Sequence, residues 1–313
     1  MLTSLAPART RPSYRPFRVS VRRIVRLTPS FFRVTFAGAE LADFGTAGLD
    51  QRVKLLLPLP GVGFDHLGVD DPDVRDSGDW YSRWRELPDG LRNPLRTYTV
   101  RSVRSKSAEV DIDFAAHGDI GPASAWVRRA AVGDELVLVG PDARGENPTV
   151  GIEWNPGSAT SLLLVGDETA VPAISSILES LPAGTPATAL LEVPCADDRL
   201  RLELPSSVSV TWLCRDGAPV GSMLEPTVRE WITAHLAAAA HAAALEEFAD
   251  IDIDASILWE TPQDPPSAAL YAWLAGEAGV IKGLRRFLVR DCGLDRRQVA
   301  FMGYWREGRA EAA

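Results

Sequence analysis

The sequence predicts two domains: an N-terminal six-stranded antiparallel β-barrel, then a C-terminal α/β domain with an open parallel sheet. Three observations predict this. The 313 residues exceed the size at which one hydrophobic core usually stops growing. Strand-like runs fill the first half, whereas strands alternate with helices in the second. Between them, residues 140–158 are rich in Gly, Pro and Asn, which is typical of a domain junction. We therefore expect a barrel domain over 1–150 with a basic N-terminal arm, and an α/β domain over 151–313 with a basic C-terminal helix.

The barrel prediction rests on six short segments rich in Val, Ile and Phe, with apolar and polar residues in partial alternation. They are residues 17–27, 31–37, 52–57, 97–103, 109–115 and 135–139. One helix, near 123–131, is expected in this half, so the pattern favours a small barrel capped by a helix. The long loop 58–94 contains Trp80, Tyr81 and Trp84, and we expect it to be a packed excursion rather than a linker.

The α/β prediction starts from residues 161–165, a continuous apolar run expected of a strand buried on both faces. A turn at 166–169 leads into a helix over 171–181. Further strands are expected at 187–193, 208–213, 270–274 and 299–304, and further helices at 231–248 and 277–292. Right-handed crossovers would connect them. Residues 250–267 are expected to form a flap or an irregular insertion.

Composition excludes several classes of protein. The net charge of −9 disfavours a protein that coats nucleic acid. No apolar run approaches the roughly 20 residues of a membrane span, and the N-terminus lacks the apolar region of a secretory signal. The three cysteines are scattered, which argues against a disulfide framework or a cysteine zinc site and favours the cytoplasm. The four histidines form no metal-ligand cluster, so no metal site is expected; they are His66, His117, His235 and His241.

The common phosphate-binding, hydrolase and zinc motifs are absent from the sequence. Three turns remain as candidates for a functional site. Arg96–Arg101 places a guanidinium, an aromatic face and hydroxyls side by side, which suits a planar anionic ligand or an ordinary edge strand. The segment 117–126 opens a helix with a Gly-Pro step, which suits an anion or a simple helix cap. Gly166–Ala170 follows a buried strand and precedes a helix, where α/β sheets bind nucleotides.

Together these motifs resemble the siderophore-interacting proteins, FAD-dependent ferric-siderophore reductases of the ferredoxin-reductase-like superfamily. The resemblance runs over nearly the whole chain. Its residues are Arg15-Pro16-Phe17, Arg26-Leu27-Thr28-Pro29, Val53-Lys54-Leu55, Asp79-Trp80-Tyr81, Arg96–Arg101, Asp111-Ile112-Asp113-Phe114, His117-Gly118, Gly121–Trp126, Gly166–Ala170, Trp273-Leu274-Ala275-Gly276-Glu277 and Gly303-Tyr304-Trp305-Arg306.

The resemblance implies two cofactors, FAD and either NADH or NADPH as electron donor. Arg96, Tyr98 and Thr99 would hold FAD, with Tyr98 against the isoalloxazine and Thr99 near its reactive edge. The remaining cofactor positions comprise neighbours in the barrel, a set for the diphosphate and adenosine, and two turns for the pyridine nucleotide. They are Thr97 and Asp113; His117, Asp119, Gly121, Pro122, Ala123, Ser124 and Trp126; and Gly166, Asp167, Glu168, Thr169, Ala170, Gly276 and Glu277.

The resemblance also implies a ferric siderophore as substrate, reached through a basic pocket. Lys54 matches a lysine of the family, while Lys282 and Arg306 are chosen on charge and on their place in the C-terminal motifs. A basic pocket would concentrate an anionic iron complex even on an acidic protein. The flavin would carry the chemistry, so no catalytic side chain is expected. Neither nucleic acid nor membrane is an expected partner, and a monomer is the default.

The sequence departs from the family pattern at two places, and two other functions are possible. Cys214 stands where many members would have His, and residues 231–267 are longer than expected, so both affect the pyridine-nucleotide contacts. One alternative keeps the fold but makes the protein a general flavin reductase acting on another acceptor. The other is a siderophore-binding protein without turnover, whose mark would be the absence of bound flavin.

Overall fold

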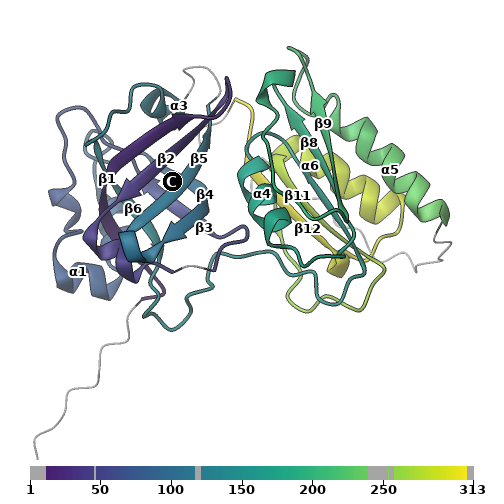
Figure 1. The fold of residues 1–313 in the computed structure, drawn as a ribbon. Helices are drawn as coiled ribbons and strands as arrows, with labels where there is room; N and C mark the ends of the chain where they lie inside the picture. Colours follow the sequence, from purple (N-terminus) through teal and green to yellow (C-terminus); the bar gives the residue numbers. More distant parts are fainter. Residues whose placement is uncertain (1–11, 46, 117–120, 239–252, 254–256, 309–313) are drawn as a thin grey trace, which may run out of the picture. The chain divides into compact units, whose positions relative to one another are not determined.

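The computed structural model describes residues 12–45, 47–116, 121–238, 253 and 257–308 (Figure 1). The chain divides into two compact units. The first comprises the residues up to 25 together with 33–152. The second comprises 26–32 and the residues from 153 onward.

The first unit is a closed barrel of six strands in the order β1-β2-β5-β4-β3-β6 (Figure 1). Apolar side chains from alternate positions fill its interior, and Phe17, Leu55 and Ile112 are fully buried. Antiparallel pairing of β1 with β6 sets Phe17 opposite Leu138. The predicted barrel is confirmed. Its strands are β1 (Tyr14–Arg26), β2 (Phe31–Ala37), β3 (Arg52–Leu56), β4 (Leu95–Arg104), β5 (Glu109–Ala115) and β6 (Glu135–Pro141).

The connection from β3 to β4 is packed, as expected, but it contains two short helices, α1 (Pro72–Ser77) and α2 (Trp80–Glu86). The expectation of a single helix in the first half is therefore wrong. Asp71 begins α1 by accepting a hydrogen bond from the amide of Asp73 at 2.9 Å, with Pro72 in the first turn. Trp84 is buried and donates from Nε1 to the carbonyl of Asn93 at 2.8 Å.

Helix α3 (Pro122–Val127) is shorter than the predicted helix over 123–131. The chain turns back after it to reach β1. There the amide of Val21 bonds to the carbonyl of Asp134 at 2.8 Å, and the amide of Gly133 bonds to the carbonyl of Val21 at 2.9 Å. A contact so distant in the sequence cannot be seen in the local pattern that predicted the longer helix.

The second unit holds a six-stranded sheet in the order β10-β12-β11-β7-β8-β9 (Figure 1). The long strands of this sheet pair in parallel with their neighbours, which confirms the predicted α/β sheet. The two-residue β10 runs antiparallel to β12, within the segment expected to be irregular. The strands are β7 (Ser161–Gly166), β8 (Ala187–Val193), β9 (Val208–Cys214), β10 (Trp259–Glu260), β11 (Leu270–Glu277) and β12 (Val299–Trp305).

Helices cover both faces of this sheet. Helices α5 (Leu224–Ala238) and α6 (Ala278–Arg285) share one buried cluster with the strands, in which Val228 and Ile281 pack with Val165. Helix α4 (Val171–Ser180) lies on the opposite face (Figure 1). A sheet covered on both faces explains why the strand over 161–165 is apolar without alternation.

Two predicted helices differ from the structure. Helix α5 begins at Leu224, seven residues before the expected start, because the carboxylate of Glu192 accepts the amides of Gly221, Met223 and Leu224 at 2.8–3.1 Å. The expected residues 239–248 lie outside the described residues. Helix α6 is followed by a π-helical stretch over 286–291, where the amide of Cys292 bonds to the carbonyl of Phe287 at 2.9 Å. No helix in the described ranges is long and apolar enough to cross a bilayer.

Candidate functional site

Strand β4 carries the first predicted site, Arg96–Thr99. Its pairing with β3 sets Lys54 opposite Thr97 and Val53 opposite Tyr98. The Nζ of Lys54 donates to Oγ1 of Thr97 at 3.1 Å, so the predicted substrate lysine contacts the predicted flavin-binding strand. Lys54, Thr97 and Tyr98 are half-buried, whereas Thr99 is buried. A cation therefore lies beside the hydroxyl of Thr97, on the residue that precedes the aromatic ring of Tyr98 in the strand.

An aromatic cluster fixes the ring of Tyr98. Its centroid lies 4.4 Å from that of Phe114 on β5, and Phe114 lies 5.6 Å from Trp126 on α3. Phe36 on β2 stacks on Trp126, with centroids 6.2 Å apart. Phe36 and Phe114 are fully buried, while Tyr98 is partly exposed. One part of the Tyr98 ring is thus held by the core, and the exposed part can contact a planar ligand.

The other predicted FAD-binding residues of the barrel unit lie on β4 and at the start of α3. Arg96 is half-buried, and its Nη1 donates to the carbonyl of Leu95 at 2.7 Å. At the start of α3, Gly121 has φ +117°, a conformation that favours glycine, and Pro122 occupies the first turn. Ala123, Ser124 and Trp126 are buried in that helix. His117 and Asp119 lie outside the described residues.

Asp113 is engaged within the barrel wall. Its two carboxylate oxygens accept from Nε and Nη2 of Arg33 at 2.7 Å each, and Arg101 lies 3.5 Å away. The neighbouring Asp111 pairs with Arg104 and accepts from Thr35 at 2.7 Å. These bonds hold the pKa of Asp111 below its usual range against the opposing effect of burial. Asp113 thus positions two arginines on the outer face of the barrel.

In the second unit, the carboxylate of Asp167 joins three chain segments. Its Oδ1 accepts from the amide of Thr169 at 2.9 Å, within the turn that follows β7. Its Oδ2 accepts from the amide of Glu277, at the end of β11, and from the indole Nε1 of Trp305, at the end of β12, both at 2.8 Å. Asp167 is 1% exposed. One buried group therefore ties the carboxyl ends of three neighbouring strands, where open α/β sheets bind ligands.

Burial raises the pKa of Asp167 to about 6, with the nearby charge of Glu168 acting in the same direction. The donors from Thr169 and Trp305 oppose this by favouring the ionised form. Glu168 is fully buried and forms a two-pronged ion pair with Arg215, of which one contact is 2.6 Å. Arg215 also lies 3.7 Å from Glu192. The side chains of Asp167 and Glu168 thus hold the turn in place.

Glycines let the turn and β11 come together. At Gly276, with φ +151°, an added Cβ would lie 2.6 Å from Oδ2 of Asp167. At Gly166 it would lie 2.5 Å from Cβ of Ala170. Glu277 begins α6 by accepting the amide of Val280 at 2.9 Å, and it also accepts the amide of Glu307 at 3.2 Å. The predicted nucleotide positions of both turns are therefore brought together.

The two other predicted substrate residues lie in the second unit. Lys282 is half-buried on α6. Arg306 follows β12, and its Nη1 donates to the carbonyl of Ile253 at 2.7 Å. Lys54 belongs to the first unit.

The sulfur of Cys214 lies 3.4 Å from Nη2 of Arg199, and His235 stacks on Trp231 with centroids 4.5 Å apart. In the described part of the chain, no group of three or more His, Cys, Asp or Glu side chains could hold a metal ion.

Sequence reasoning did not single out Arg215 and Trp305 as site residues. Both stand in short motifs that drew attention for other reasons, Trp212–Gly217 and Gly303–Arg306. Their partners, Glu168 and Asp167, are 47 and 138 residues away. The sequence signal that could have pointed to Arg215 and Trp305 is the acidic pair in Gly166–Ala170, which directly follows an apolar strand. Carboxylates that become buried there need hydrogen-bond donors or cations from elsewhere in the chain.

Comparison with known proteins identifies the chain. Residues 20–145 match the siderophore-interacting FAD-binding domain, and residues 159–308 match the siderophore-interacting protein family. The chain belongs to the siderophore-interacting protein family. The resemblance expected from the motifs is therefore confirmed, and FAD is the cofactor of the barrel domain.

Relatives in this family match over most of their length. Ferric vibriobactin reductase ViuB of Vibrio cholerae is 27% identical over 92% of this chain and 88% of its own. The NADPH-dependent ferric-chelate reductase of Escherichia coli is 27% identical over 96% of each chain. The crystal structure of a siderophore utilization protein from T. fusca covers 97% of each chain, with 27% identity and a TM-score of 0.68.

The fold extends beyond the family. The ferredoxin reductase in carbazole 1,9a-dioxygenase covers 93% of this chain and 70% of its own, with a TM-score of 0.55 and 14% identity. The predicted ferredoxin-reductase-like architecture is thus confirmed.

The residues on β4 fit a flavin: Tyr98 offers part of a ring held by Phe114, Thr99 offers a hydroxyl, and Arg96 offers a guanidinium.

Proposed function

We propose that this protein is an FAD-dependent reductase that takes electrons from NADH or NADPH and reduces ferric siderophores, releasing Fe(II) for iron assimilation. The observation that carries the proposal is the contact between Lys54 and Thr97, which puts a cation beside the flavin-binding strand of a siderophore-interacting FAD-binding domain. The names of ViuB and of the Escherichia coli ferric-chelate reductase, which match nearly the whole chain, support the reaction type.

The barrel residues would bind and orient the flavin. Tyr98 would pack against the isoalloxazine, Thr99 would lie near its reactive edge with Thr97 and Asp113 beside it, and Arg96 would neutralise diphosphate charge. The positions around α3 would take the diphosphate and adenosine; they are His117, Asp119, Gly121, Pro122, Ala123, Ser124 and Trp126. When bound, FAD accepts two electrons from the nicotinamide and passes single electrons to Fe(III).

The second unit would bind the pyridine nucleotide. The backbone of Gly166–Ala170 and of Gly276–Glu277 would form its cleft, because the carboxylates of Asp167 and Glu168 are engaged internally. Their hydrogen bonds keep the turn and β11 in one arrangement, so the cleft does not have to be ordered when the nucleotide binds. The proposed domains are an FAD-binding barrel over 1–150 and an NAD(P)H-binding domain over 151–313.

The substrate would be held by charge. Many ferric siderophore complexes are anionic, so Lys54, with Lys282 and Arg306 as further candidates, would raise their local concentration. Iron must leave after reduction, and within the described residues no side-chain cluster could retain it. We place the reaction in the cytoplasm and the protein as a monomer.

The test is the visible spectrum of the purified protein under anaerobic conditions. We expect a flavin spectrum that bleaches on adding NADH or NADPH and returns on adding a ferric siderophore, with Fe(II) captured by a chelator. Equal recovery rates with a quinone would instead make the protein a general flavin reductase. A colourless protein that FAD cannot reconstitute would make it a siderophore-binding protein.

A further inference from the structure

Part of the barrel wall carries cations on its outer side. Lys54 on β3 lies opposite Thr97 on β4, and its Nζ donates to the Thr97 hydroxyl at 3.1 Å. The neighbouring Val53 and Leu55 are fully buried, so the alternation of the strand places Lys54 on the outer side. Thr99 lies on the same side of β4 as Thr97, because side chains two positions apart in a strand share a face. The two threonines therefore lead from the lysine toward β5.

Asp113 on β5 holds two arginines beside these threonines. The pairing of β5 with β4 places Asp113 next to Thr99. Its carboxylate accepts from Nε and Nη2 of Arg33 on β2 at 2.7 Å each and lies 3.5 Å from Nε of Arg101 on β4. The side chain of Asp113 is fully buried, whereas those of Arg33 and Arg101 are 30% and 14% exposed. One carboxylate thus fixes two guanidinium groups that still reach the surface.

This part of the outer side carries a surplus of positive charge. Arginine stays protonated in proteins, so two guanidinium groups against one carboxylate leave one charge unbalanced, and Lys54 adds another. The next ion cluster along β4 and β5 has the opposite balance, because Arg104 faces Asp111 at 2.6 Å and Glu109 at 3.0 Å. An anion is therefore attracted to the lysine and the two held arginines rather than to that cluster.

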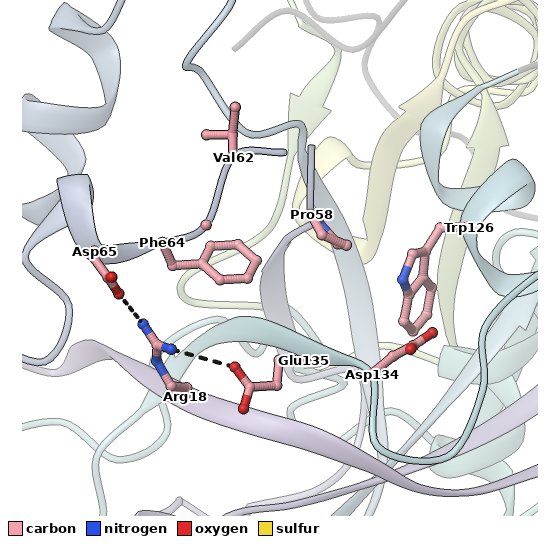
Figure 2. Close-up of a pocket in the computed structure, with 9 residues that line it drawn as sticks. Arg18, Pro58, Val62, Phe64, Asp65, Trp126, Asp134 and Glu135 are labelled. Carbon is pink, nitrogen blue, oxygen red and sulfur yellow. Dashed lines mark hydrogen bonds and ion pairs between the residues drawn. The ribbon is translucent and has the colours of Figure 1, made fainter. Parts of the chain in front are cut away.

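The cavity beside α3 is unsuited to an anion. Its volume is about 460 Å³, and Arg18 is the cation of its lining. Figure 2 shows this guanidinium between Asp65 and Glu135, at 2.8 and 3.3 Å. Asp134 lines the cavity as well. Three carboxylates against one guanidinium repel an anion, so an anionic substrate is directed to the outer side of the barrel wall.

We propose that Arg33 and Arg101, together with Lys54, select ferric siderophores by charge and favour tris-catecholate complexes. This proposal rests on the reductase function proposed above. Three doubly charged catecholates around Fe(III) give a trianion, whereas three singly charged hydroxamates give a neutral complex. The surplus positive charge attracts the trianion and finds no net charge on the neutral complex. Asp113 keeps both guanidinium groups in position for this contact.

The test measures how the FAD-loaded protein binds the gallium(III) complexes of a tris-catecholate and of a tris-hydroxamate siderophore. Gallium(III) has the charge of Fe(III) but is not reduced, so calorimetric titration reports affinity without turnover. We expect the catecholate complex to bind at least about tenfold more tightly at low ionic strength. This preference should shrink as salt is added, because salt screens the attraction between charges.

Arg33→Gln and Arg101→Gln each remove one of the two held charges. Each should raise the Kd of the catecholate complex about 3- to 10-fold and leave that of the hydroxamate complex within about twofold. Arg33→Lys keeps the charge and should keep the preference, and it covers the event that Arg33→Gln does not fold. Arg85→Gln is the matched control, because Arg85 is an exposed arginine on α2 of the same unit, and it should change neither Kd.

Equal Kd values for the two complexes would overturn selection by charge. So would arginine variants that change both values equally or change neither. In these cases the reductase proposal still stands, provided that a ferric siderophore reoxidises the reduced flavin. Loss of FAD from Arg33→Gln or Arg101→Gln would also overturn the inference, since these arginines would then hold the cofactor. If no ferric siderophore reoxidises the flavin, the proposed function itself fails.

Discussion

The indole Nε1 of Trp305 donates a 2.8 Å hydrogen bond to Oδ2 of Asp167, although 138 residues separate them. The same oxygen accepts the amide of Glu277 at 2.8 Å. A single carboxylate therefore fixes the ends of β7, β11 and β12 relative to one another.

The stability of the second unit depends on the protonation of Asp167. Burial raises its pKa to about 6, whereas an unfolded Asp titrates near 3.9. Between these values the folded state keeps a proton that the unfolded state releases, so the free energy of unfolding falls as the pH rises from about 4 to about 6, by up to about 3 kcal/mol. Asp167→Asn should remove this contribution. Urea unfolding at a series of pH values measures it, and identical pH slopes for both proteins would contradict it.

Glu168→Gln should destabilise the protein strongly. Glu168 is fully buried, and its charge is balanced by Arg215, whose side chain is only 12% exposed. Losing this charge leaves the buried guanidinium of Arg215 with only the more distant carboxylate of Glu192, at 3.7 Å, which costs up to about 3–5 kcal/mol. Asp89→Asn is the control, because Asp89 is 97% exposed and its pairing with Arg92 should be worth less than about 1 kcal/mol. Urea unfolding compares the two, and a similar small loss in both would refute the prediction.

Gly276→Ala should impair the nucleotide site while sparing the flavin site. An added methyl would lie 2.6 Å from Asp167 at a backbone angle that favours glycine. We expect a loss of about 1–3 kcal/mol in stability and a roughly tenfold rise in KM for NADH or NADPH, with flavin content unchanged. At Gly90 an added Cβ meets nothing within 4 Å, so Gly90→Ala is the control. A variant with normal nucleotide kinetics would show that this turn does not shape the cleft.

Lys54→Gln should raise KM for a ferric siderophore by roughly 3- to 10-fold, because it removes a positive charge from the proposed substrate site. Flavin content and KM for the nucleotide should stay the same. Lys106→Gln is the control, since Lys106 is an exposed lysine elsewhere in the barrel unit. Unchanged siderophore kinetics would remove Lys54 from the site, and a loss of flavin would show that it acts through Thr97.

Local sequence patterns correctly predicted those strands and turns whose structure depends on residues close by in the sequence. The apolar run over 161–165 and the turn of Gly166–Ala170 indicated a strand end that could bind a nucleotide, and β7 ends there. The alternation in 109–115 indicated a barrel strand, which is β5. Patterns of this kind are set by which face of a strand is buried, so they are visible without the rest of the chain.

Long-range pairing could not be predicted in this way. The start of α5 depends on Glu192, about thirty residues earlier, and the role of Trp305 depends on Asp167. Asp113 stood in a family motif, yet only the structure shows that Arg33 and Arg101 occupy its carboxylate. Tertiary packing determines such partners. A sequence motif shows that a residue is present but not which residues it contacts.

The shared acceptor at Asp167 also constrains how this family can change over time. Replacing Asp167 with an apolar residue removes the acceptor of an indole, of an amide in β11 and of the amide of Thr169 in a single step. A compensating change at one of these positions leaves the others unsatisfied. Two of the three donors are backbone amides, which no substitution removes, so position 167 should keep a hydrogen-bond acceptor in related sequences even where position 305 changes.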